Sequence, residues 1–265
     1  MGHRVGIAGL RRGLALARTF ANMASCEVAA LCDVDQETLI RAGREFPSAL
    51  QFADYGEMLD AGLDIAVVAT PIPVHREQTI AALEAGCHVL QEVTLADSVE
   101  ACRDIVRAVE AHPGQKFMLA ENTCYWAHIM SWAEMWRKGL AGDLIYAEAE
   151  YVHDVRQLTR KPDGSLTWRA FRPPVLYCTH SLGPILKVTG ERPVRVCGLH
   201  TGSKMEPAVS SFYDFEVGII QTASHAVIKI LRGQGMVREP GFHYYSIYGT
   251  RMTLETARPP EELRT

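Results

Sequence analysis

The sequence lacks the features that would indicate a membrane segment or a nucleic-acid-binding surface. No stretch of its 265 residues approaches the roughly 20 consecutive apolar residues that span a bilayer. The formal net charge is −4, from 27 Lys and Arg against 31 Asp and Glu, whereas a protein that binds phosphate backbones needs a basic surface. We therefore expect no membrane contact and no nucleic-acid partner.

The sequence also lacks any sign of a disulfide framework or a metal cluster. The seven cysteines are odd in number and widely spaced: Cys26, Cys32, Cys87, Cys102, Cys124, Cys178 and Cys197. Metal clusters need closely spaced ligands, and secreted frameworks usually have even counts. The N-terminal residues run straight into a strand pattern, without a secretory signal. We expect no metal, free thiols in a reducing compartment, and a cytoplasmic protein.

The first 120 residues alternate short apolar runs with helical patterns, which is typical of βαβ units and a parallel sheet. Strands are expected at residues 4–8, 27–32, 65–69, 88–91 and 116–120, the last as the sixth strand of the sheet. Helices are expected at residues 14–22, 36–46, 55–61, 74–85 and 98–112, the last with Ser98 as its cap. Six strands with five connecting helices make a doubly wound dinucleotide-binding sheet, so residues 1–120 are predicted to form a Rossmann domain.

The pattern changes after residue 120, which predicts a second domain over residues 121–265. Helices are expected at residues 129–138 and 182–189, and strands at residues 144–153, 195–200, 212–222, 225–231, 244–248 and 252–255. Between them, residues 157–174 form a long polar stretch with prolines, of a kind that often carries function. A smaller α+β domain with a mostly antiparallel sheet is therefore predicted.

A glycine turn, GIAGLRRG at residues 6–13, follows the first strand. In a dinucleotide-binding turn, G-x-G-x-x-G, the glycines let the backbone approach pyrophosphate at a helix N-terminus. Gly9 fits the first position, but Arg11 occupies the second and Gly13 comes one residue early. A guanidinium here can stack on adenine or pair with phosphate. A glycine turn without a ligand is the alternative.

Polar residues follow two further strands of this domain. Asp33 ends the second strand, where a carboxylate accepts both ribose hydroxyls and repels a 2′-phosphate, which favours NAD over NADP. A solvated loop acid is the alternative for Asp33. The segment ATPIPVH, residues 69–75, lies at the same predicted edge, and Thr70 is expected to bond ribose or phosphate. For His75, cofactor contact and a plain first-turn position both stay open.

The order of these motifs resembles the glucose–fructose oxidoreductase, inositol dehydrogenase and rhizopine catabolism family (Gfo/Idh/MocA). The resemblance covers essentially the whole chain and rests on Gly9, Asp33, residues 69–75, ALEAG at 82–86, Glu92, AENTCYW at 120–126, GDLI at 142–145, WR at 168–169 and THSL at 179–182. It implies a Rossmann domain followed by a domain with an open sheet, whose pairing would make a dimer or tetramer. It also implies NAD or NADP exchanging hydride with a sugar, cyclitol or related polyol.

Motif positions and the resemblance together give a set of candidate site residues. Those expected at the cofactor are Gly9, Leu10, Arg11, Arg12, Gly13, Asp33, Ala69, Thr70, Pro71, His75, Glu92, Val93 and Asn122. Those expected at the substrate are Tyr125, His153, Asp154, Trp168, Arg169 and Tyr177. His180 is the expected catalytic base, because the pKa of an unperturbed histidine, about 6.5, lies near working pH. A histidine without a role is the alternative.

Two motifs depart from the family. Its Glu-Lys-Pro triplet is Glu92-Val93-Thr94 here, and Leu176 stands four residues before His180, where relatives have Asp. Valine cannot help to deprotonate a substrate hydroxyl. The second domain also looks short at its C-terminal end for this family. A dehydrogenase is favoured, and two alternatives stay open: a redox-neutral glycosidase or lyase that retains NAD, and a cofactor-binding protein without turnover.

Overall fold

The structure, a computed structural model, describes residues 2–209, 211–236 and 243–257. The chain divides into two compact units, Met1–Ala120 and Glu121–Thr265. Within the described ranges, no helix combines the length and the apolar character needed to cross a membrane.

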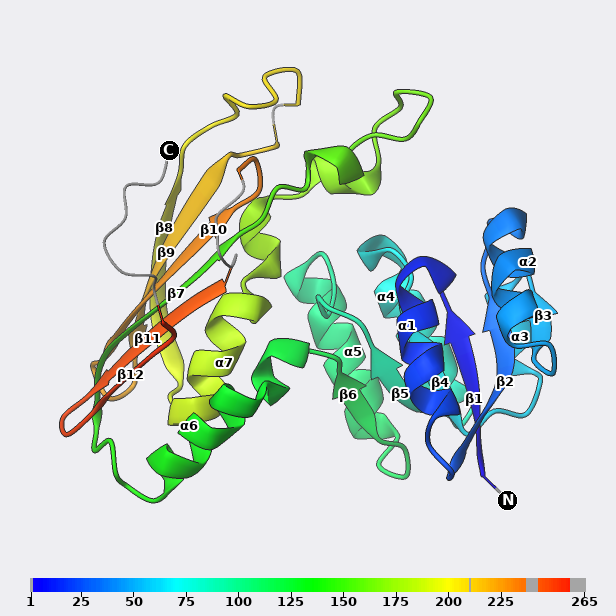
Figure 1. Cartoon of the computed structure of the whole chain (residues 1–265), viewed down its shortest axis with the longest axis horizontal. Coiled ribbons are helices and arrows are strands. Elements are labelled where there is room, and N and C mark those ends of the chain that lie inside the picture. Colours follow the sequence, from blue (N-terminus) through cyan, green and yellow to red (C-terminus); the bar gives the residue numbers. More distant parts are fainter. Residues whose placement is uncertain (1, 210, 237–242, 258–265) are drawn as a thin grey trace. The chain divides into compact units, whose positions relative to one another are not determined.

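The N-terminal unit is a six-stranded parallel sheet flanked by helices (Figure 1). Its strands are β1 (His3–Ala8), β2 (Cys26–Cys32), β3 (Leu50–Phe52), β4 (Ile65–Val68), β5 (His88–Gln91) and β6 (Phe117–Leu119). Its helices are α1 (Leu10–Ala21), α2 (Gln36–Glu45), α3 (Tyr55–Leu59), α4 (His75–Glu84) and α5 (Val99–Ala111), with a short 3-10 turn, η1 (Ile72–Val74), before α4. The strand order β3-β2-β1-β4-β5-β6 is that of a doubly wound sheet, which confirms the predicted fold class.

Two details of the predicted N-terminal unit were wrong. The prediction gave ranges for five strands of a six-stranded sheet. The missing one is β3, whose three residues are too few to stand out as an apolar run. Helix α1 begins at Leu10 rather than at residue 14. Its buried residues are Leu10, Gly13 and Ala17, and because two of these have little or no side chain, they do not show as an apolar stripe.

Over its described residues, the C-terminal unit consists of a six-stranded sheet in the order β12-β11-β7-β10-β9-β8 and two α-helices. The strands are β7 (Leu144–Val152), β8 (Pro193–His200), β9 (Phe215–Thr222), β10 (Val227–Gly233), β11 (His243–Gly249) and β12 (Thr253–Glu255). The helices are α6 (Ala127–Arg137) and α7 (Thr179–Thr189), and the 3-10 turns are η2 (Asn122–Tyr125), η3 (Arg156–Leu158), η4 (Trp168–Phe171) and η5 (Pro174–Tyr177). Only β7 and β10 pair in parallel, so the predicted mostly antiparallel sheet is confirmed.

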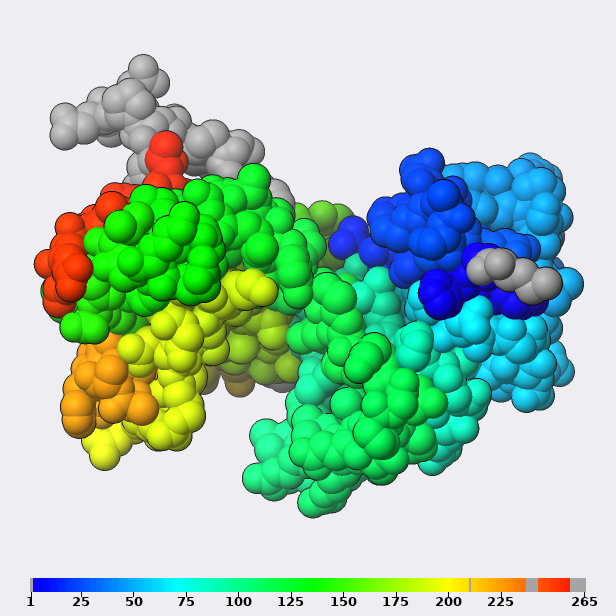
Figure 2. Space-filling view, turned by 90° about the horizontal axis from the view of Figure 1, so that it is seen from below, coloured from blue at the N-terminus to red at the C-terminus, as the bar shows by residue number. Residues whose placement is uncertain are grey.

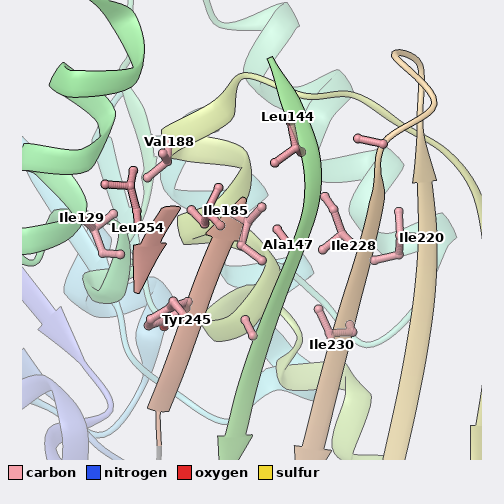
Figure 3. Packing of buried hydrophobic residues seen from close by; sticks show 13 residues of the cluster. Ile129, Leu144, Ala147, Ile185, Val188, Ile220, Ile228, Ile230, Tyr245 and Leu254 are labelled. Carbon is pink, nitrogen blue, oxygen red and sulfur yellow. The ribbon is translucent and has the colours of Figure 1, made fainter. Parts of the chain in front are cut away.

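One face of this sheet packs against α7. The side chains of β7 point alternately to the two faces of the sheet, and Ala147, Ala149 and Tyr151 are buried. Ile185 and Val188 of α7 belong to the same buried cluster (Figure 3). Helix α6 contributes one fully buried residue, Ile129, and packs the partly buried Trp132, Ala133, Met135 and Trp136 against the same cluster. Its outer residues lie within the green surface of Figure 2. Close packing of this kind fixes α7, and with it the first turn that carries His180.

Candidate functional site

In the N-terminal unit, the glycine turn is shaped by the close approach of two backbone segments. Gly9 has a φ of 84°, and a Cβ built there would lie 2.5 Å from the backbone of Ala69, just after β4. Only glycine avoids both the left-handed strain and this collision. Helix α1 begins at the next residue, and the Leu10 N–H donates to Asp33 Oδ2 at 2.8 Å. The turn thus brings the start of α1 to the ends of β2 and β4.

The carboxylate of Asp33 holds two backbone segments at the end of β2. Besides the bond from Leu10, its Oδ1 accepts the Asp35 N–H at 2.9 Å. Each carboxylate oxygen has a further lone pair, so the side chain can still accept hydroxyl protons. Arg11 and Arg12 stand in the first turn of α1, which contains no acidic residue. A helix start with free amides and basic neighbours suits an anion such as pyrophosphate.

His75 connects the turn after β4 with the loop after β5. Its ring is fully buried, with Nε2 lying 2.8 Å from the carbonyl oxygen of Thr70 and Nδ1 lying 2.8 Å from that of Thr94. Burial holds the pKa of His75 below its usual value, so the imidazole is neutral and donates to one of the two carbonyls. A ring enclosed in this way supports the plain first-turn position for His75 rather than cofactor contact. Nearby, the Thr70 hydroxyl donates to Gln78 Oε1 at 2.5 Å.

The loop after β5 carries Glu92, Val93 and Thr94. Glu92 is nearly buried, and its Oε1 accepts from Arg12 Nε at 2.6 Å. The peptide bond between Val93 and Thr94 is cis. Because valine has no ionisable group, a proton acceptor for catalysis must come from another position in the chain.

The C-terminal unit provides such a group in a hydrogen-bonded pair, the partly buried His180 and the buried Glu121. The imidazole Nδ1 lies 2.7 Å from Glu121 Oε1, which also accepts from the Thr123 hydroxyl at 2.5 Å. Burial would raise the pKa of Glu121, but its hydrogen bonds with His180 and Thr123 hold that pKa below its usual value. An ionised carboxylate here keeps a proton on Nδ1 and leaves Nε2 with a lone pair. Sequence reasoning gave Glu121 no role, although it lies in the AEN motif at residues 120–122.

Aromatic rings surround His180. The Tyr151 ring meets the imidazole edge-on at 5.0 Å between centroids, and Tyr177 lies 6.2 Å from it. His243 stacks on Tyr151 at 4.4 Å. Burial, together with the nearby His180, lowers the pKa of His243 to about 3. His243 is therefore neutral at working pH and acts as a packing partner of Tyr151.

Most of the predicted substrate residues lie within this part of the C-terminal unit. The Tyr151 hydroxyl lies 3.2 Å from His153 Nδ1. Arg169 stacks over Trp168 at 4.3 Å and donates to the Tyr177 hydroxyl at 3.4 Å. His153 thus contacts Tyr151, and Arg169 contacts Tyr177, the two rings beside His180. Trp168 is connected to Tyr177 through Arg169.

The other two predicted substrate residues are placed differently. The Asp154 carboxylate is held by Arg156, with contacts of 2.7 and 3.0 Å. Tyr125 is 51% exposed and lies under Lys187, two helical turns along α7 from His180. Neither has a contact with His180 in the part of the chain that the structure describes, so their predicted substrate roles gain no support.

A separate cavity of about 590 Å³ lies along β8 and β9. Its walls also include Val175, Cys178 and Leu182, and they are largely aliphatic. Neither His180 nor Tyr151 contributes to these walls, so the cavity is distinct from the group of aromatic rings around His180.

The fold and glycine turn of the N-terminal unit correspond to a known family. Residues 3–120 match the family model GFO_IDH_MocA, described as "Oxidoreductase family, NAD-binding Rossmann fold". Through this region, the chain belongs to the Gfo/Idh/MocA family. The family resemblance inferred from the motifs is confirmed.

Curated relatives of this Gfo/Idh/MocA chain include glycosyl hydrolase family 109 proteins. Protein 2 of that family from Shewanella sp. (strain ANA-3) is 33% identical over 198 residues, which cover 69% of this chain and 43% of the relative. A family 109 protein from Solibacter usitatus is 33% identical over 199 residues, covering 69% of this chain and 45% of the relative. The match thus spans less than half the length of either relative.

Solved structures extend the likeness in fold to the whole chain. The scyllo-inositol dehydrogenase of Lactobacillus casei, solved with NAD(H) and scyllo-inositol, superposes with a TM-score of 0.85 at 20% identity, covering 100% of this chain and 79% of that one. A levoglucosan dehydrogenase in complex with NADH and levoglucosan also superposes with a TM-score of 0.85 at 20% identity. That match covers 97% of this chain and 73% of the levoglucosan dehydrogenase. At this identity, the likeness shows a shared two-domain fold.

Replacing Gly9 with Ala should destabilise the N-terminal unit by about 1–3 kcal/mol, because the left-handed φ is strained and the new Cβ meets the Ala69 backbone. Gly86→Ala is the matched control, since Gly86 has the same φ of 84° but nothing within 4 Å of the Cβ position. Urea unfolding of both variants measures the difference. Equal losses for the two variants would show that the close approach does not matter.

Proposed function

We propose that the chain binds NAD and exchanges hydride between the cofactor and a ring carbon of a sugar, cyclitol or related polyol. The observation that carries this proposal is the hydrogen-bonded pair of Glu121 and His180, because oxidation of an alcohol needs a base for the hydroxyl proton. The family of the N-terminal unit supports the cofactor.

The proposed cofactor site combines the glycine turn with three strand ends. Backbone amides and guanidinium groups at Arg11 and Arg12 would hold the pyrophosphate at the start of α1. Asp33 would accept the ribose hydroxyls of the adenosine half, which favours NAD over NADP. When bound, the nicotinamide ring supplies the hydride acceptor. The remaining positions proposed to contact the cofactor are Gly9, Leu10, Gly13, Ala69, Thr70, Pro71, Glu92, Val93 and Asn122.

His180 would act through its Nε2 atom. Glu121 fixes the proton on Nδ1 and orients the ring, so the Nε2 lone pair takes the proton of the substrate hydroxyl. The carboxylate then stabilises the imidazolium that forms. Tyr177 would offer an aromatic face to the apolar side of a sugar ring. The Tyr151 ring, which His243 and Arg232 cover, would instead hold His180 in place.

A redox-neutral glycosidase is the second candidate, and the names of the relatives favour it. The curated relatives are named glycosyl hydrolase family 109 proteins. In this reaction, oxidation of the sugar would be followed by elimination, addition of water and re-reduction by the same NADH. The proton removed by His180 in the first step would be returned in the last, so the same base serves both candidates.

A cofactor assay separates the candidates. Purified protein with NAD and a panel of sugars, cyclitols and nitrophenyl glycosides should accumulate NADH if it is a dehydrogenase. Release of nitrophenol without net NADH indicates the redox-neutral path. NAD binding without either product indicates a cofactor-binding protein, and failure to bind NAD contradicts the proposal.

We further propose a cytoplasmic homo-oligomer, a dimer or tetramer. All eight residues of β8, a strand at the sheet edge, are exposed, including Val194, Val196 and Leu199. An apolar edge strand of this kind is normally covered by another surface. Light scattering over a concentration series tests the assembly, and a monomer at micromolar concentration would contradict it.

A further inference from the structure

The C-terminal sheet carries a line of polar side chains on the face that packs against α7. Arg232 of β10 pairs directly with Tyr151 of β7 and with Glu216 of β9. Tyr151 in turn pairs with His243 of β11. Directly opposite residues share a face of a sheet, and Arg232 continues the face of Ile230, which lies in the core beside α7.

Arg232 is a buried cation without a carboxylate partner. The residue is 3% exposed, and Nη1 donates to the carbonyl oxygens of Tyr151 and Gly233. Its guanidinium lies 4.0 Å from the centre of the Tyr151 ring. Among the residues that the structure describes, no carboxylate oxygen comes within 4.0 Å of it, and the buried Nε has no hydrogen-bond partner. Burial lowers the pKa of Arg232 to about 10, so the charge remains at neutral pH.

The nearest acid among these residues, Glu216, compensates the charge of Arg232 only in part. Glu216 Oε2 accepts the backbone N–H of Val175 at 2.6 Å instead of pairing with Arg232. Burial also raises the pKa of Glu216. A buried cation without a full counter-charge is costly, and such groups concentrate at functional sites.

Arg232 has an unused edge, formed by its Nε and Nη2 atoms. Arg18 binds a carboxylate through the same two atoms. Arg18 donates to Glu45 through Nε at 2.6 Å and Nη2 at 2.9 Å. In Arg232, neither Nε nor Nη2 has a hydrogen bond to any described residue. Two parallel donors in a plane match the two oxygens of a carboxylate.

This edge belongs to the same cluster as the proposed base. The Tyr151 ring neighbours both the guanidinium of Arg232, at 4.0 Å, and the imidazole of His180, at 5.0 Å. Tyr177 lies about 6 Å from both groups. A molecule held at Arg232 therefore lies beside the rings that surround His180.

We propose that Arg232 is a substrate-recognition residue and that the substrate carries a carboxylate, as a uronic acid or a carboxylated cyclitol does. The carboxylate would accept from Nε and Nη2 of Arg232, while His180 takes the proton of a hydroxyl on the same molecule. The inference rests on the proposed function and narrows its substrate class.

Calorimetric titration of matched sugar pairs tests the inference without any turnover. Glucuronate is compared with glucose, and galacturonate with galactose, by titration into the protein in the presence of excess NAD. At least one uronate should bind about tenfold or more tighter than its neutral partner, as expected for hydrogen bonds to a charged group. Arg232→Met should abolish that preference, and Arg232→Lys should retain part of it. Lys229→Met is the control, since Lys229 lies on the opposite face of β10, paired with Glu148 at 2.8 Å, and should keep the preference.

Thermal unfolding of the same variants distinguishes recognition from a structural role. Removing a buried cation that is only partly compensated should leave the melting temperature of Arg232→Met unchanged or raised. A lowered melting temperature for both variants, or uronates that bind no tighter than their neutral partners, would overturn the inference. If uronate binding depends on Arg232 but NAD is neither bound nor turned over, the proposed function fails while the recognition site stands. If neutral sugars are oxidised as well as uronates, only the inference fails.

Discussion

His180→Asn should slow hydride transfer by about 10²–10⁴-fold, the usual contribution of a positioned general base. The expected loss follows from the orientation of the ring, in which Glu121 occupies Nδ1 and leaves Nε2 for the substrate hydroxyl. NAD affinity should be unchanged, because the glycine turn and Asp33 belong to the other unit. The measurement is the single-turnover rate of nicotinamide reduction or, for the redox-neutral path, the rate of glycoside cleavage.

His225→Asn is a suitable control for that experiment. His225 is exposed in the turn between β9 and β10 and has a φ of 69°, a conformation that asparagine tolerates well. This variant should retain the full rate. If His180→Asn stays within a few-fold of the unmodified protein, His180 is not the base.

Glu121→Gln should lower the same rate by about 10²-fold, at the low end of the range for a general base. The amide keeps a similar shape but cannot stabilise the imidazolium with a negative charge, and it can present an N–H to Nδ1 and so place the proton on Nε2. NAD binding again serves as the control. An unchanged rate would show that the contact between Glu121 and His180 is only structural.

Glu121→Gln also gives a prediction for how the free energy of unfolding depends on pH. The folded state holds the pKa of Glu121 below its usual value, so its ionised form stabilises the fold at pH values above the pKa of the unfolded chain, about 4.3. That contribution is lost as the pH falls through the lower folded pKa. The difference in unfolding free energy between Glu121→Gln and the unmodified chain should therefore be constant near neutrality and shrink in acid. Urea unfolding from neutral pH down to pH 3 measures it, and a difference independent of pH would contradict the assigned ionisation.

The fold could be predicted from sequence because its signals are local. Alternation of apolar runs with helical patterns gave the doubly wound sheet, and the period-2 pattern of residues 144–153 gave strand β7, in which Ala147 and Ala149 are buried. Short or side-chain-poor elements escaped, such as β3 and the first turn of α1. Local pattern is informative only where an element is long enough, or buries enough side chain, to show a period.

The candidate site was harder to predict, because its contacts join residues far apart in the chain. His180 was found by its motif, but its partner Glu121 lies 59 residues earlier and was not. Arg232 was missed because the predicted strand ended at residue 231. The sequence did contain a signal for it. Arg232 stands two positions after Ile230, so in a longer strand it would lie on the same buried face. For His75 the sequence left two interpretations open, and only the structure shows that the ring is enclosed between two backbone carbonyls.

Calorimetric titration with NAD and NADP tests the account most directly, because every proposed step requires a nicotinamide dinucleotide at the glycine turn. We expect saturable binding of NAD, clearly weaker binding of NADP because Asp33 repels a 2′-phosphate, and loss of this preference in Asp33→Ser. A folded protein that binds neither dinucleotide would contradict the account.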